Sequence, residues 1–118
     1  MIKITKFGGS SVANAKQFQK VKSIIESDPD RRFVVVSASG REHKTDNKVT
    51  DLLYLIEAHL NYHVDHLSLF QLIEDRFISI KNELHLTYPI EQDLAQLKES
   101  LNSSISTDYL VSRGEYLT

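Results

Sequence analysis

Residues 3–13 read KITKFGGSSVA and run from a short strand through two glycines to the start of a helix. Adjacent glycines let backbone amides approach a ligand without interference from Cβ atoms, and a helix start adds unpaired N–H groups and a partial positive charge. Lys6 places a full positive charge beside them. The pattern favours a phosphate-binding turn, although a tight turn closed by a serine N-cap explains the same residues. Neither common glycine-rich phosphate motif is present.

The surrounding residues predict a βαβ unit. Residues 1–7 read as one strand, and residues 33–37 read as a second strand that is buried on both faces. Residues 27–30 contain a proline and end the intervening helix. Such crossovers are right-handed in about 98% of cases, so we expect parallel strands, with Gly8-Gly9 and Ser39-Gly40 meeting at the edge where open α/β sheets bind ligands. The helix itself is predicted by an apolar face formed by Val12, Ala15, Phe18, Val21, Ile24 and Ile25.

A polar segment, residues 41–48, reads as a surface loop and leads into a further helix. The apolar spacing from Val49 to Leu60 predicts this helix, and either Asn47 or Thr50 could cap it. If Thr50 lies in the first turn, its hydroxyl faces the same edge as the glycines.

Two longer apolar seams predict an antiparallel pair of helices. Tyr88-Pro89 stops the first of them, because proline disfavours helix in the residue before it. We interpret the seams as core packing and not as a ligand pocket, since apolar spacing of this kind is what helix pairs bury. The seams are formed by Leu67, Phe70, Ile73, Phe77, Ile80 and Leu84, and by Ile90, Leu94, Leu97 and Leu101.

A last helix is predicted after a cap region at residues 103–108. Asp108, Ser112 and Glu115 recur at helical spacing and share one face, and Gly114 leaves a flat place beside Glu115. From the pattern alone, a solvated polar flank explains these residues as well as a site does.

Composition limits the classes of function. The chain has 118 residues, of which 41% are hydrophobic and 25% are charged, and this composition predicts one globular unit. A net charge of -2 gives no global attraction to nucleic acid or to an anionic membrane, so neither is an expected partner. The absence of cysteine excludes disulfides and thiolate chemistry. The chain opens on a strand and not on a signal peptide, so we expect a cytoplasmic protein.

The histidines invite a metal hypothesis. Three of the five, His59, His63 and His66, could share one helical face with Asp65. Asn61 and Asp65, however, look like a helix boundary that would break this face, so we predict no metal ligands in the chain. The other two, His43 and His85, are isolated and expected to be exposed.

Three blocks of sequence resemble the aspartate kinases. Residues 6–13 closely resemble the K-F-G-G-[ST]-S-V-A signature that opens this family, residues 37–40 and 48–53 resemble its second block, and residues 111–118 resemble its S-x-G-E block. The blocks occur in the family's order. The resemblance implies an α/β fold, the N-terminal fragment of a three-layer αβα amino-acid kinase fold, with one parallel βαβ unit followed mostly by helices.

The resemblance also implies a reaction and its residues. The family transfers the γ-phosphoryl of ATP, with Mg²⁺, to the side-chain carboxylate of L-aspartate and so makes 4-phospho-L-aspartate, the first step of lysine, threonine and methionine biosynthesis. Thr50 and Glu115 would bind aspartate, Lys6 would be catalytic, and no residue here would bind a metal directly. The ATP-binding residues would be Lys6, Phe7, Gly8, Gly9, Ser10, Ser39 and Gly40.

The same resemblance implies that residues 1–118 are a truncated N-terminal part of the catalytic domain, with residues 62–105 as a helical insertion. The family's adenine-binding residues would lie downstream, so we expect the isolated chain to be inactive, and we expect a homo-oligomer. Two alternatives remain open. The chain could belong to another amino-acid kinase acting on a different carboxylate or carbamate, or it could be a non-catalytic fragment that self-associates through its helical pair and an open sheet edge.

Overall fold

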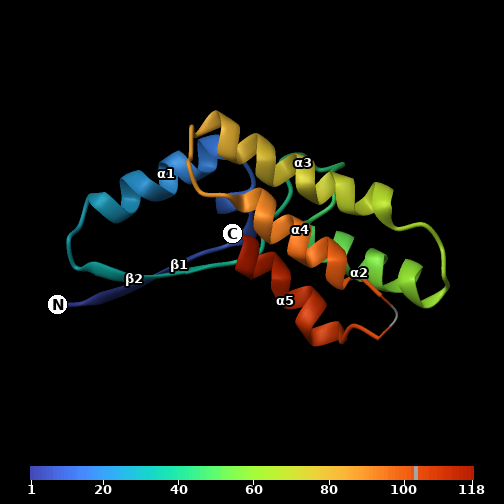
Figure 1. The fold of residues 1–118 in the computed structure, drawn as a ribbon. Helices are drawn as coiled ribbons and strands as arrows, with labels where there is room; N and C mark the ends of the chain where they lie inside the picture. The colour runs from blue at the N-terminus through green and yellow to red at the C-terminus, as the bar shows by residue number, and fades with distance from the viewer. Residues whose placement is uncertain (103) are drawn as a thin grey trace.

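The structure is a computed structural model that describes residues 1–102 and 104–118. Two parallel strands and the first long helix form one end of the molecule, and the remaining helices form a bundle at the other (Figure 1). The predicted α/β class, with one parallel βαβ unit followed mostly by helices, is confirmed. In chain order the elements are β1 (Lys3–Phe7), the 3₁₀ turn η1 (Gly9–Val12), α1 (Ala15–Glu26), β2 (Arg31–Val36), α2 (Val49–Asn61), α3 (Leu67–Glu83), α4 (Ile90–Ser100) and α5 (Thr107–Leu117).

Helix α1 begins later than the apolar pattern predicts. The prediction starts its apolar face at Val12, but Val12 ends η1 and the helix begins at Ala15. Asn14 takes extended backbone geometry and its side chain accepts a hydrogen bond from the Gln17 amide at 3.0 Å, so it is the N-cap. The glycine turn leads into η1 without the serine N-cap that would explain a simple tight turn. The N-cap position of η1 is occupied by Gly8, which has no side chain to cap it.

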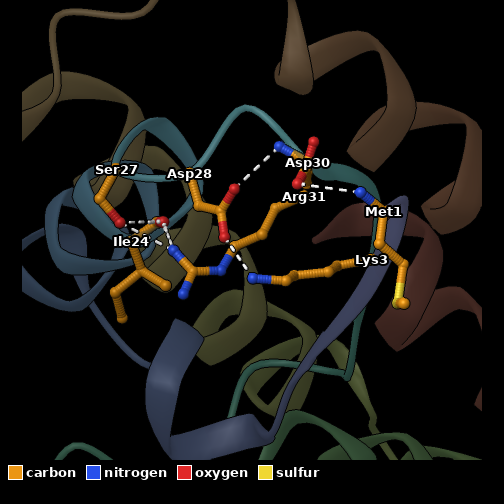
Figure 2. Close-up of polar contacts among 7 residues, drawn as sticks. All are labelled: Met1, Lys3, Ile24, Ser27, Asp28, Asp30 and Arg31. Carbon is orange, nitrogen blue, oxygen red and sulfur yellow. Dashed lines mark hydrogen bonds and ion pairs between the residues drawn. The ribbon is translucent and has the colours of Figure 1, made fainter.

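The turn between α1 and β2 is tied to the start of β1 by ion pairs (Figure 2). Lys3 Nζ lies 2.5 Å from Asp28 Oδ2, and the N-terminal amine lies 3.3 Å from Asp30 Oδ2. The hydrogen bond from Lys3 lowers the pKa of Asp28 below its ordinary value. Arg31 Nη1 donates to the Ile24 carbonyl and so holds the end of α1. These contacts fix the end of the βαβ unit that is opposite the glycines.

Strand β2 was predicted to be buried on both faces, and this is wrong for the described residues. Phe33 is 59% exposed, Val34 40% and Val35 47%. In this part of the chain the sheet has two strands, and the small core that covers them joins Phe7 and Val36, at their carboxyl ends, to α1. Apolar residues in a strand are buried only where another element packs on them, and among the described residues no element covers most of β2.

The main core lies among the four later helices. Helix α2 packs on α3 and α5, α3 packs on α4, and α4 packs on α5. Most residues of the predicted seams are buried, but Leu67 is 51% exposed and lies outside the core. Helices α3 and α4 form the predicted antiparallel pair (Figure 1). No helix in the described residues is long and apolar enough to cross a membrane. The fully buried side chains at the centre of this core are Val49, Leu52, Leu53, Ile56, Phe70, Ile73 and Leu110.

The prediction that Tyr88-Pro89 stops helix α3 is wrong. It ends at Glu83, because His85 adopts left-handed geometry with φ 55° and the Leu86 amide then donates back to the Lys81 carbonyl at 3.0 Å. Pro89 instead occupies the N-cap position of α4.

The start of α5 agrees with the predicted cap region. Ser106 is the N-cap, and its hydroxyl accepts a hydrogen bond from the Tyr109 amide at 3.2 Å. Ser103, the first residue of that predicted region, lies outside the described residues.

Candidate functional site

The segments that follow β1 and β2 meet at the carboxyl edge of the sheet, as predicted. The Ser37 amide donates to the Phe7 carbonyl at 3.1 Å, and the Gly40 amide donates to the Gly9 carbonyl at 2.8 Å. The two parallel strands thus continue their pairing into the residues that follow them. We call these residues the first glycine segment (residues 8–10) and the second glycine segment (residues 37–40).

Close contact between the two backbones explains two of the glycines. A Cβ atom on Gly40 would lie 2.6 Å from the carbonyl carbon of Gly9, and a Cβ atom on Gly9 would lie 3.0 Å from the Ala38 carbonyl oxygen. Neither glycine has a positive φ, so the requirement is space and not an unusual backbone conformation. A Cβ atom on Gly8 would meet nothing within 4 Å, which leaves this residue open to a ligand.

A hollow of about 520 Å³ lies beside these segments, and residues from four parts of the chain line it. It brings together six of the residues predicted from the motif blocks: Gly9, Ser10, Ser39, Gly40, Thr50 and Glu115. The hollow is also lined by Ser37, Ala38, Arg41 and Lys48.

Three predicted residues do not line this hollow. Lys6 is exposed near the end of β1, paired in register with Val35. Phe7 is buried in the small core against Val12, so its side chain serves packing. Gly8 lies at the turn itself, where its carbonyl accepts a hydrogen bond from the Ser11 amide at 3.1 Å.

The start of α2 carries Thr50 to the hollow. The Val49 amide donates to the Ser39 carbonyl at 3.0 Å, which joins the second glycine segment directly to the first turn of the helix. Thr50 lies in that first turn, as the prediction required. Neither Asn47 nor Thr50 is the N-cap, however. Lys48 occupies that position without a side-chain cap bond, which leaves the first α2 amides without a side-chain partner there.

Gly114 allows α5 to bring Glu115 to the same place. Gly114 is buried, and a Cβ atom on it would lie 2.8 Å from the Ala38 Cβ. The flat place predicted beside Glu115 is therefore a contact surface between α5 and the second glycine segment. Asp108 and Ser112, predicted on the face of Glu115, are exposed and do not line the hollow.

Sequence reasoning missed Arg41, Lys48 and Arg76. Arg41 and Lys48 add two cations to the hollow, and a signal was present because both lie in the segment that joins Gly40 to α2. Arg76 comes from α3, far away in sequence, and hydrogen-bonds to Gly40, Ser39 and Asn47. No motif surrounds Arg76, so no signal for it exists in the local sequence.

The polar groups of the hollow suit a ligand that carries both signs of charge. Arg41, Lys48 and the α2 N-terminus favour anions such as phosphate or carboxylate. Glu115 is the single acidic side chain among the lining residues and favours an ammonium group.

The histidine spacing does not build a metal site in the described residues. His59 belongs to α2 and its Nδ1 lies 2.7 Å from the Asp65 carbonyl, whereas His66 is the N-cap of α3. His43 is exposed as predicted, but it is not isolated, because it lies in a polar loop near Glu42 and Asp46.

The chain matches one protein family and several known relatives. Residues 1–115 match the amino acid kinase family. Aspartokinase 3 of Bacillus subtilis (strain 168) is 42% identical over 85 residues, which are 72% of this chain and 19% of that protein. The crystal structure of Clostridium acetobutylicum aspartate kinase superposes with a TM-score of 0.92 at 44% identity and covers 97% of this chain.

Aspartokinase III of Escherichia coli is a more distant match. Its complex with aspartate and ADP superposes with a TM-score of 0.77 at 29% identity and covers 99% of this chain. The chain spans 26% of the Clostridium structure and 27% of the Escherichia one. The resemblance to the aspartate kinases is confirmed by these matches, and the chain belongs to the amino acid kinase family.

Proposed function

We propose that these residues form part of an aspartate kinase, which transfers the γ-phosphoryl of ATP to the side-chain carboxylate of L-aspartate. The observation that carries the proposal is that Thr50 and Glu115 line one hollow with Gly9 and Gly40, although they come from separate parts of the chain. The Escherichia relative was crystallised with aspartate and ADP, which are a substrate and a product of this reaction. The product, 4-phospho-L-aspartate, would enter lysine, threonine and methionine biosynthesis.

The backbone around Gly8-Gly9 and Ser39-Gly40, at the carboxyl edge of the sheet, is proposed to hold the phosphates of ATP. Backbone amides of the Phe7–Ser10 turn and of Ser39, together with the α2 N-terminus, would give oriented N–H donors that cost no reorganisation during the reaction. The Gly40 amide donates to the Gly9 carbonyl, so Gly40 would contribute by letting the two backbones lie close together. Lys6 is proposed to stabilise charge on the transferring phosphoryl group, and its exposed position near the end of β1 leaves it free to reach a ligand. Phe7 would take part through its backbone, because its ring is buried.

ATP would bring Mg²⁺ with it. Glu115 is the single carboxylate among the residues that line the hollow, so they do not form a protein cage for the ion. Mg²⁺ commonly keeps few protein ligands and binds substrate phosphates, where it neutralises their charge. The hollow therefore fits a metal that arrives as part of the substrate.

Aspartate is proposed to lie between Thr50 and Glu115. The Glu115 carboxylate would hold the substrate ammonium group by a charge-assisted hydrogen bond, and Thr50 would orient the substrate through its hydroxyl. The attacking carboxylate is ionised at neutral pH, so no general base is required. Charge repulsion is the main barrier, and positioning together with the cations Arg41 and Lys48 reduces it.

The isolated chain of 118 residues is proposed to be inactive. It spans 26% of the Clostridium aspartate kinase structure, and in-line transfer requires donor and acceptor to be fixed by one scaffold. Weak binding of phosphate at Gly8-Gly9 would remain, because those contacts are local to the βαβ unit.

A second candidate is self-association of this chain without catalysis. It is favoured by the exposed apolar side chains of Phe33, Val34 and Val35 on β2. Sedimentation of the isolated chain tests it, and a monomer at high concentration would exclude it.

A coupled assay for ADP release tests the proposed function. The protein expressed from its complete reading frame is supplied with Mg-ATP and with aspartate, glutamate or carbamate, against a blank without acceptor. We expect release that depends on aspartate. Release with another acceptor alone would identify a different amino-acid kinase.

A further inference from the structure

Arg76 joins the helical bundle to the candidate site. It lies on α3, and its guanidinium reaches the segment between β2 and α2. Nη1 donates to the Gly40 carbonyl and to the Ser39 hydroxyl at 3.3 Å, and Nη2 donates to the Asn47 carbonyl at 3.1 Å. Gly40 and Asn47 stand at the two ends of the polar loop, so one side chain holds both ends of it.

Two of the three partners of Arg76, Ser39 and Gly40, line the hollow. Ser39 is fully buried, its carbonyl accepts from the Val49 amide, and its neighbour Gly40 donates to Gly9. A shift of Ser39-Gly40 would therefore move the contact with the first glycine turn and the start of α2 together.

The environment of Arg76 fits a role in fixing this loop. Its side chain is half-buried, and burial lowers its pKa, whereas the nearby Asp46 and Glu42 oppose that shift. A partly desolvated cation is costly unless it is hydrogen-bonded, and here three acceptors of the loop satisfy its fork. Lysine could not reproduce this geometry, because an ammonium is a point charge without a planar fork.

We infer that Arg76 is a positioning residue for phosphoryl transfer, which holds Ser39-Gly40 against Gly9 by clamping both ends of the 41–48 loop. This inference rests on the proposed function and extends it to the helical segment, residues 62–105, for which the sequence indicates no role. Arg76 does not line the hollow, so it acts through the loop and not on the substrate.

The test compares Arg76→Met and Arg76→Lys with the matched control Lys81→Met in the protein from the complete reading frame. Methionine keeps the apolar stem of the side chain, which limits the loss of packing. Lys81 is also a cation on α3 with an ion-pair partner, Glu91 Oε2 at 2.7 Å, but that pair joins α3 to α4. Arg76→Met and Lys81→Met each remove one tryptic site within α3, so this variant and its control are matched in protease sites, whereas Arg76→Lys keeps its site.

Two readouts are used. The first is the rate of tryptic cleavage after Lys44, followed by mass spectrometry without any substrate, because Lys44 lies inside the clamped loop. The second is kcat and KM for aspartate and for Mg-ATP. We expect Arg76→Met to speed cleavage after Lys44 and to lower kcat by about 100-fold, the loss typical of a small misplacement of reacting groups. Arg76→Lys should recover part of kcat, and Lys81→Met should keep wild-type cleavage and kcat.

The outcomes separate the two proposals. Wild-type cleavage after Lys44 in Arg76→Met, or an equal fall of kcat in Lys81→Met, would overturn the clamp. If the unsubstituted protein showed no aspartate-dependent ADP release, the proposed function would fail, while faster cleavage in Arg76→Met would still support the clamp.

Discussion

The contact between Gly114 and Ala38 gives a quantitative test of how α5 is held against the site. Alanine at position 114 would place its Cβ 2.8 Å from the Ala38 Cβ and 3.5 Å from Leu53 Cδ1. Ordinary contact begins near 3.4 Å, so α5 and the segment holding Ala38 must separate by about 0.6 Å. Glu115 would move with the helix.

Two opposing terms decide the effect of Gly114→Ala on stability. Alanine is favoured over glycine inside a helix by about 1 kcal/mol. Overpacking a well-packed contact costs about 1 to 3 kcal/mol. We therefore expect the free energy of unfolding to fall by about 0 to 2 kcal/mol. A measurement on this variant alone cannot separate the two opposing contributions.

A double-mutant cycle removes this ambiguity. In an Ala38→Gly background the opposing Cβ is absent, so Gly114→Ala should raise the free energy of unfolding by about 1 kcal/mol. Urea unfolding of the four proteins measures the coupling, expected at about 1 to 3 kcal/mol. The same effect of Gly114→Ala in both backgrounds would refute the contact between α5 and the glycine segment.

Three further predictions concern charge and substrate binding. Lys6→Met should lower kcat by orders of magnitude with little change in the urea midpoint, and near-wild-type turnover would contradict its assigned role. Glu115→Gln should weaken the binding of aspartate by about 1.5 to 3 kcal/mol, and Thr50→Val should also weaken the binding of aspartate more than that of ATP. Steady-state kinetics with each substrate varied in turn measures both effects, and equal losses of affinity for the two substrates would indicate a folding defect. Asp28→Asn should lower the free energy of unfolding at neutral pH, because the ion pair with Lys3 lowers the pKa of Asp28 in the folded state. The stabilisation by this pair is present above the ordinary pKa of 3.8 and is lost as pH falls through the folded pKa, so wild type and variant should become equally stable in acid. A stability difference that stays constant with pH would contradict the pairing.

The parts of the site that lie in local motifs could be predicted from the sequence. Gly9 and Gly40 follow two strands of one βαβ unit, and right-handed parallel topology brings such residues to one edge. Thr50 reaches the hollow because its helix begins directly after that edge. Glu115 was singled out by the family resemblance, since helical spacing alone does not tell a site residue from a solvated one.

The remaining features depend on long-range or exceptional contacts. Arg76 acts on backbone carbonyls 36 and 29 residues away, and any sequence supplies such acceptors. His85 ends α3 in a left-handed conformation that is uncommon for residues other than glycine, so proline is the stronger local signal. Phe33 is exposed, although its apolar side chain predicts burial. Whether such a residue is buried depends on which elements pack against β2, and the residue itself does not determine this.

Trapping of the acyl phosphate with hydroxylamine tests the central claim most directly. Phosphorylation of the aspartate side chain creates an acyl phosphate, which hydroxylamine converts to a hydroxamate with release of phosphate. The protein from the complete reading frame, supplied with Mg-ATP, aspartate and hydroxylamine, should form aspartyl hydroxamate in step with ADP, and Glu115→Gln should require far more aspartate to do so. Release of ADP without hydroxamate, or hydroxamate formed from another carboxylate in preference to aspartate, would contradict the assignment of this site to aspartate phosphorylation.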